Sequence, residues 1–213
     1  MGEMKGGERH GIGRLQYDNG NLYVGGWERD VKSGFGMLAW TNKDVYHGEW
    51  KSDKMWGYGY FCFSNGNSYA GMFVSDNKEG TGKFNWSNGD TYEGEWIKDD
   101  MTGQGTTRHS NGNTYSGNHK SNVKDGRGKM EWASGDKFEG EWKNGVIQGK
   151  GTFHYADGGQ YKGEWVQDKR QGSGTMKHTN GDVYIGCWLN DMRHGNGSCQ
   201  VCVCARLCVR IVL

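Results

Sequence analysis

The chain has 213 residues, of which 39 are glycine and none is proline. Its 26 basic and 25 acidic side chains leave a net charge of +1, which excludes the basic excess of a nucleic-acid-binding surface. Aromatic residues make up 13% of a chain that is only 33% hydrophobic, and this predicts a thin core built from rings.

In chain order, residues 1–10 are expected to form a lead-in, residues 11–197 a repeat array, and residues 198–213 a divergent cysteine-rich end. The opening residues lack the apolar core of a signal peptide, and no apolar stretch approaches the length that crosses a membrane. Only Cys62 and Cys187 lie within the array, too far apart to be a disulfide framework. These features predict a reducing, cytoplasmic location.

Two motifs recur every 23 residues through the array. Gly-x-Gly keeps this period nine times, from Gly11 to Gly195, which gives eight full repeats and the start of a ninth. No insertion or deletion interrupts the spacing, so the chain is predicted to be a repeat protein. The second motif is Tyr-x-Gly-x-Trp with single replacements, and it begins at Tyr23, Tyr46, Tyr69, Tyr92, Tyr115, Phe138, Tyr161 and Tyr184.

Each repeat is predicted to be a β-hairpin, as residues 11–33 illustrate. Large side chains alternate along both halves, at Leu15 and Tyr17 and again around Tyr23, which is typical of strands. The Asp-Asn-Gly between the halves and its counterparts in later repeats are turn residues, and only Lys43 replaces the glycine.

The alternation of side chains between the two faces of the ribbon decides the length of this turn. A two-residue loop would put Tyr17 and Tyr23 on opposite faces of the ribbon. A three-residue loop with glycine last pairs Leu15 with Tyr23, and Gly13 with Gly25. We therefore expect three-residue loops, paired glycines forming a slot that rings cover, one aromatic face and one solvated face.

The six residues between each Tyr-x-Gly-x-Trp and the next Gly-x-Gly are predicted to be polar connectors. A lone hairpin is marginal in water, so the repeats must stack. The predicted fold is all-β: an elongated, twisted, solenoid-like rod of about eight stacked 23-residue antiparallel hairpins. Most connectors carry an aspartate that we attribute to turn chemistry, namely Asp30, Asp53, Asp76, Asp99, Asp168 and Asp191.

The fifth repeat departs from the pattern. Residues 107–109 read Thr-Arg-His where other repeats carry large apolar side chains, and His119 stands in the Trp position. The local loss of burial is on the order of several kcal/mol. Three interpretations remain open: neutral drift, a hinge, or a polar contact site that uses His109 and His119.

The C-terminal segment departs differently, because residues 198–213 contain Cys-x2-Cys-x-Cys-x3-Cys. This spacing does not match a usual zinc site. Two interpretations remain open: a degenerate final half-repeat that caps the open sheet edge, or an unstructured tail. Cys202, Cys204 and Cys208 are candidate lipidation sites for a membrane anchor.

The repeated pattern resembles the MORN repeat (membrane occupation and recognition nexus). Tyr92–Trp96, Phe138–Trp142 and Tyr161–Trp165 carry the resemblance best, and it covers residues 11–197. It implies an array of hairpins that serves as a scaffold in ciliary radial spokes, cytoskeletal assemblies or membrane junctions. In some members the array is an appendage to a lipid kinase or a methyltransferase. Residues 7–13 resemble the first repeat of radial-spoke-head members.

The sequence predicts no enzyme, because no catalytic module accompanies the repeats and paired carboxylates recur along the chain instead of meeting in one site. No catalytic residue, cofactor or metal is expected. The predicted function is a scaffold that binds a peptide or helix of another protein along its aromatic face, in a cytoskeletal or ciliary (axonemal) assembly. The candidate partner-binding residues are Trp40, Trp86, Trp132, Tyr155, His109 and His119.

The alternative function is an adaptor at the membrane periphery that binds anionic phospholipid and links it to the cytoskeleton. The connectors carry cations, such as Lys32 and Arg170, but acidic residues interleave with them. The open edges at both ends of the sheet also predict a homo-oligomer.

Overall fold

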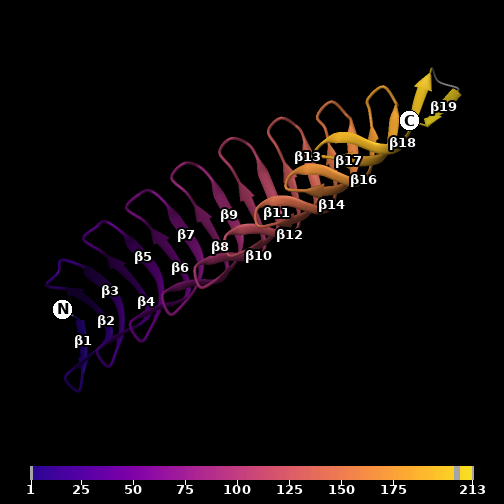
Figure 1. Ribbon diagram of the computed structural model, residues 1–213. Coiled ribbons are helices and arrows are strands. Elements are labelled where there is room, and N and C mark those ends of the chain that lie inside the picture. The colour runs from indigo at the N-terminus through magenta and orange to yellow at the C-terminus, as the bar shows by residue number, and fades with distance from the viewer. Residues whose placement is uncertain (1, 204–206, 213) are drawn as a thin grey trace. The chain divides into compact units, whose positions relative to one another are not determined.

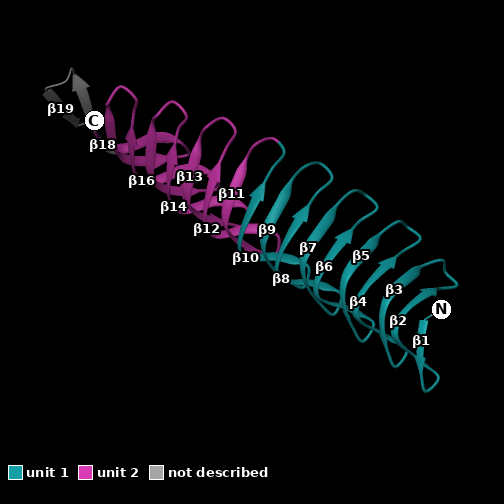
Figure 2. Cartoon of the chain, turned by 180° about the vertical axis from the view of Figure 1, so that it is seen from behind, with its two compact units in different colours: residues 1–110 teal, residues 111–213 magenta. Residues whose placement is uncertain are grey.

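The computed structural model describes the backbone of residues 2–203 and 207–212, and the side chains up to residue 195 and at Ser198. In these residues every regular element is a β-strand (Figure 1). The chain divides into two compact units, Met1–Ser110 and Asn111–Leu213 (Figure 2). Each unit is described by itself below.

In unit 1, each strand pairs antiparallel with the next strand in the chain. This arrangement confirms the predicted all-β array of stacked hairpins. The strands are β1 (Gly2–Lys5), β2 (Glu8–Gln16), β3 (Leu22–Glu28), β4 (Val31–Ala39), β5 (Val45–Lys51), β6 (Lys54–Cys62), β7 (Ser68–Val74), β8 (Asn77–Asn85), β9 (Thr91–Ile97) and β10 (Asp100–Arg108).

Unit 2 repeats the same antiparallel order. Its strands are β11 (Thr114–Lys120), β12 (Val123–Glu131), β13 (Lys137–Lys143), β14 (Val146–His154), β15 (Gln160–Val166), β16 (Lys169–Lys177), β17 (Val183–Leu189), β18 (Met192–Val203) and β19 (Leu207–Val212).

The three-residue loops are confirmed in register and conformation. Leu15 pairs with Tyr23 and Gly13 with Gly25, as the three-residue loop predicts. Gly20, the last loop residue, has a φ of 87°, and its N–H donates to the carbonyl of Tyr17 at 2.9 Å. Lys43 adopts the same left-handed conformation at 75° without the benefit of glycine.

The prediction of six-residue connectors is wrong, because the strands run almost to the turn. β3 ends at Glu28 and β4 begins at Val31, so the turn holds only two residues. Arg29 and Asp30 have φ values of 51° and 66°, the pair of left-handed residues that defines a type I′ turn. Consecutive strands are therefore joined alternately by three-residue and two-residue loops.

Each Gly-x-Gly marks a β-bulge. Gly57, the first glycine of one such motif, has a φ of 64°, and the register shifts between β5 and β6 where it lies. The strands of both units bend along their length (Figure 1), as bulges cause. The Glu49 carboxylate accepts a hydrogen bond from the N–H of Tyr58 at 3.0 Å, and Glu95 does the same for Gln104 at 2.8 Å. These glutamates lie on the face that was predicted to be solvated, and they hold the bulges.

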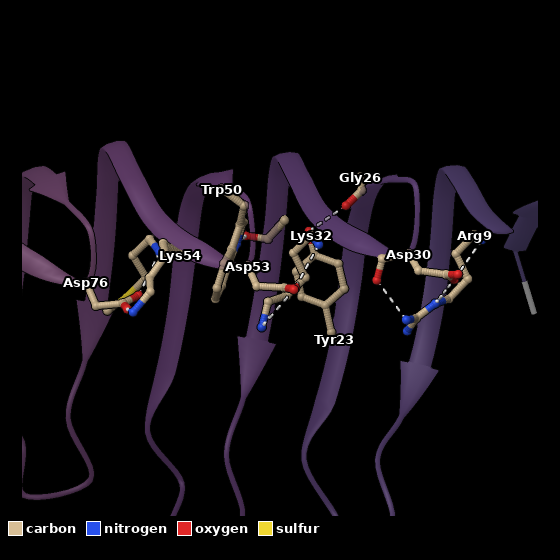
Figure 3. Close-up of polar contacts among 11 residues, drawn as sticks. Arg9, Tyr23, Gly26, Asp30, Lys32, Trp50, Asp53, Lys54 and Asp76 are labelled. Carbon is tan, nitrogen blue, oxygen red and sulfur yellow. Dashed lines mark hydrogen bonds and ion pairs between the residues drawn. The ribbon is translucent and has the colours of Figure 1, made fainter.

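The core is a single line of aromatic rings that lie over the paired glycines. Tyr23 is fully buried, and a Cβ added at Gly36 would overlap its ring. The Tyr23 hydroxyl donates to the carbonyl of Gly26 at 3.0 Å (Figure 3). Its ring meets Trp27 of its own hairpin edge-on at 5.0 Å, and Trp50 of the next repeat at 5.5 Å. The predicted ring-covered slot is confirmed, and within each unit it couples a repeat to its successor, as Tyr115 and Trp142 do in unit 2.

Candidate functional site

One edge of the aromatic face carries half-buried rings, each just before a three-residue loop. We call these residues the aromatic row. Burial of the row is incomplete, whereas the Tyr and Trp of the core lie within 5% of full burial. In unit 1 the row is Tyr17, Trp40, Phe63 and Trp86, and in unit 2 it is Trp132 and Tyr155.

The four predicted partner-binding aromatics all lie in the aromatic row. Trp40 stacks on Phe61 at 5.3 Å with 26° between the ring planes, and Trp86 packs on Phe84 at 4.7 Å. In unit 2, Phe153 packs against Trp132 at 5.3 Å and against Tyr155 at 4.7 Å. Each ring is thus fixed by a neighbouring ring and still presents accessible surface, which is a geometry suited to contact without side-chain rearrangement.

His109 occupies the same column of the repeat as the aromatic row, next to the boundary of unit 1. Its Nδ1 lies 3.2 Å from the Asp90 carboxylate. The backbone N–H of Ser110 and then the His109 side chain lower the pKa of Asp90 to about 2. The row therefore ends in a polar, hydrogen-bonded position in unit 1.

His119 lies elsewhere, in the core of unit 2. It is 5% exposed, meets Tyr115 edge-on at 5.1 Å, and its Nδ1 lies 3.1 Å from the carbonyl of Gly117. A partner would not reach it, so of the two predicted histidines only His109 is placed at the surface. His119 fills the space of the missing tryptophan as a buried polar side chain.

We predict that His119 makes the fold sensitive to acid. Burial lowers the pKa of His119, so below about pH 6.5 the unfolded chain binds a proton that the folded chain resists. Stability is therefore lost as the pH falls from about 6.5 through the folded pKa, by up to about 1.4 kcal/mol per pH unit. Thermal unfolding of the wild type and of His119→Phe, the residue that Phe73 provides in this column, measures the difference. Equal pH slopes in the two proteins would contradict the prediction.

The opposite edge of the aromatic face carries charge at the two-residue turns. The Asp53 carboxylate accepts a hydrogen bond from the backbone N–H of Lys32, 21 residues earlier, at 2.9 Å (Figure 3). The predicted turn aspartates thus do more than turn the chain, because they bond each repeat to the one before. The same bond is made by Asp30, Asp76, Asp99, Asp168 and Asp191.

Cations complete this edge and lie over the tryptophans. Lys32 Nζ is 4.5 Å from the centre of the Trp50 ring, and Arg170 Cζ is 4.4 Å from that of Trp188. Burial lowers the pKa of Lys32. Ion pairs join Arg9 to Asp30, Lys54 to Asp76, Lys78 to Asp99 and Arg170 to Asp191 at 2.7–3.0 Å. In the sequence, these ion pairs correspond to cations that stand 21 or 22 residues before the aspartates. That separation brings the two charges together only when the repeats stack.

The C-terminal strands follow a register of their own. β18 pairs with β19 so that Val201 faces Val209, whereas the 23-residue pattern would place Gly197 opposite Val209. The candidate lipidation site Cys204 lies outside the described residues, as do the side chains of Cys202 and Cys208.

Three other kinds of site concern the part of the chain that the structure describes. No group of three His, Cys, Asp or Glu side chains is placed to hold a metal ion there. No helix among those residues has the length and apolar character to cross a membrane. An open hollow of about 400 Å³ in unit 2 is lined by Lys129, Lys137, Glu139 and Tyr155 among others, and its mixed charges specify no ligand.

The comparisons with known proteins concern the repeats. The family described as MORN repeat matches nine consecutive segments, residues 1–22, 23–45, 46–68, 69–91, 92–114, 115–137, 138–160, 161–183 and 184–200. No curated protein shows a significant match to the chain.

Solved structures give distant matches. The SAS-4 (dCPAP) TCP domain of Drosophila melanogaster, in complex with a proline-rich motif of Ana2 (dSTIL), is 14% identical, with 82% of this chain and 88% of that chain covered and a TM-score of 0.46. The Danio rerio CPAP TCP10 domain, in complex with a STIL peptide, is 12% identical, with coverages of 84% and 91% and a TM-score of 0.28. Likenesses of this size bear on neither the fold nor the function of this chain.

Proposed function

Because the chain belongs to the MORN-repeat family, a non-enzymatic protein-interaction module, we propose that it is a structural scaffold that binds a partner peptide or helix along the aromatic row. The assembly we propose is cytoskeletal or ciliary, in the axoneme and of the radial-spoke kind. Residues 11–197 are the scaffold, residues 1–10 lead into it, and residues 198–213 are a divergent cysteine-rich tail or a capping half-repeat.

The incomplete burial of the aromatic row carries this proposal. The fold needs the Tyr and Trp columns, which are buried to within 5%, but the row presents ring surface that the core leaves uncovered. Aromatic side chains fixed by neighbours are typical of binding hot spots, because little side-chain entropy is lost on contact. In unit 1 the rings recur once per repeat from Tyr17 to Trp86, so an extended partner would meet a regular series of contacts there.

The membrane adaptor is the second candidate, anchored through Cys202, Cys204 or Cys208. The connector cations already interact with other side chains, which argues against a membrane adaptor that binds lipid by charge alone. Lys32, Lys78 and Arg170 are held by aspartates and tryptophan rings, and so contribute less to a basic surface for anionic lipid.

Proximity labelling in ciliated cells tests the scaffold. The full chain is compared with Trp40→His/Trp86→His, which uses the residue that the same column carries at His109, and with Ile97→Thr as an exposed control outside the row. We expect labelling of axonemal or cytoskeletal proteins to fall about tenfold in the row variant and to persist in the control. Unchanged labelling in the row variant would show that the aromatic row is not the binding surface.

A second assay separates the two candidates. Co-sedimentation of the purified chain with vesicles of anionic lipid, over a series of salt concentrations, measures electrostatic membrane binding. We expect weak binding. Strong binding that salt abolishes would favour the membrane adaptor over the scaffold.

A further inference from the structure

The face opposite the aromatic face carries a group of exposed apolar side chains in unit 1. Phe35 is 72% exposed and Tyr58 is 58% exposed, which is unusual for such large rings. Both hold the middle position of a Gly-x-Gly motif, as Ile12 does one repeat earlier. We call the exposed side chains here the opposite-face patch: Ile12, Val24, Phe35, Tyr58, Tyr60 and Met72.

The opposite-face patch spreads over strands β2 to β7 and is interrupted at β5, where Glu49 pairs with Phe35 and His47 with Tyr60. Tyr58 pairs with Met72 across β6 and β7, and Met37, which is half-buried, pairs with Val24 across β3 and β4. Small residues lie beside the large ones, since Ala70 pairs with Tyr60.

The fold does not require these apolar side chains. In the next repeats of unit 1 the column of Phe35 and Tyr58 continues as Thr81 and Gln104, and the strand pairing is unchanged. The column of Tyr60 continues as Lys83, which faces Glu93. The same backbone thus accepts polar residues, so the exposed rings need another explanation.

We propose that the opposite-face patch is the interface of a two-fold symmetric homodimer, in which the patch of one chain packs on that of a second copy. At roughly 150–200 Å² for a whole large side chain, the six exposed fractions amount to about 500–600 Å². A stable interface takes about 600–800 Å² from each partner, so the patch with a narrow polar rim suffices.

Two further observations favour a second copy as the occupant. The net charge of +1 opposes self-association very little, and a two-fold axis would bring the apolar side chains of the patch onto the same side chains of the second copy. Every strand from β2 to β7 is already paired on both sides, so an extended peptide cannot add as a strand here. Face-to-face packing of two sheets remains, as in a β-sandwich. The aromatic row lies on the other face, so dimerisation leaves it accessible.

Sedimentation velocity and light scattering of the full chain, over a concentration series, test the dimer. The test variant is Phe35→Gln/Tyr58→Thr, which carries the residues that this column has at Gln104 and Thr81. The control is Ile97→Thr, a 53% exposed position of the same unit outside the patch. We expect a dimeric wild type and control, and a dissociation constant raised about 100-fold or more in the double variant, because each lost ring counts twice in a symmetric interface.

Three outcomes would overturn the proposal. They are a wild type that stays monomeric throughout the series, a dimer that survives the double variant, and a control that dissociates as readily as the double variant. Survival of the dimer would point instead to association through open sheet edges. Matching thermal unfolding of the monomeric forms shows that the variants are folded.

Discussion

Replacing Tyr69 with alanine is expected to lower the free energy of unfolding by about 3–5 kcal/mol, as truncation of a buried aromatic side chain does. Tyr69 is fully buried, and its ring meets Phe73 edge-on at 5.1 Å and Trp96 at 5.4 Å. Alanine would leave a cavity against Gly71 and Gly82, the residues on which the Tyr69 ring lies. These glycines have no side chain that could move in to fill the cavity. Chemical denaturation of the full chain measures the loss.

The matched control for this prediction is Tyr69→Phe. Only the hydrogen bond from the Tyr69 hydroxyl to the carbonyl of Met72, 3.1 Å long, is lost, so we expect a cost of about 1 kcal/mol. Phe138 shows that the column accepts phenylalanine, since it is fully buried and packs edge-on against Trp142 and Trp165 at 5.5 Å. Equal losses from the alanine and phenylalanine variants would mean that ring packing does not hold the repeats together.

Adding a single methyl group at Gly59 is expected to destabilise the fold by about 3 kcal/mol. A Cβ there would lie 2.6 Å from Cζ of Tyr46. The ring cannot move aside, because Trp50 and Phe73 each hold it edge-on at 5.2 Å. Gly59→Ala therefore displaces a core ring, and hydrogen exchange of the amides in β5 and β6 should reveal local opening.

Gly34→Ala separates this steric effect from backbone strain. Gly34 has a φ of 71°, and no atom lies within 4 Å of an added Cβ, so only the left-handed conformation opposes the substitution. We expect a cost of about 1–2 kcal/mol, without loss of the core rings. If Gly34→Ala proved as costly as Gly59→Ala, the contact with Tyr46 would not explain why the paired position must be glycine.

The hairpin was predictable because its constraints act within one repeat. The alternation around Tyr17 and Tyr23 and the glycine at residue 20 determine the loop length and the register, and both were confirmed. The prediction failed at the connector, since the type I′ turn places non-glycine residues such as Arg29 in the left-handed region, where sequence propensity argues against them.

The charged edge and the bulges could not be predicted for a different reason. Asp53 reaches the backbone of Lys32 in the preceding repeat, and Glu49 reaches the N–H of Tyr58 across a bulge. Both contacts depend on a geometry that exists only after hairpins stack, so a pattern read along one strand assigns these side chains to solvent. For the candidate site, His109 and His119 were both predicted to contact a partner, but one lies at the surface and the other fills the core position of a tryptophan.

The contact between a core tyrosine and an aromatic ring of the following repeat, such as that of Tyr23 with Trp50, gives the chain a direction of assembly. Tyr23 gains its second ring contact only when Trp50 is present, and Arg9 gains its carboxylate partner only when Asp30 has been made. During synthesis, a newly emerged hairpin therefore stays incomplete until its successor leaves the ribosome. Shortening the chain from its C-terminal end strips a contact from the repeat left behind, so fragments intended for expression should end after a complete Tyr–Trp pair.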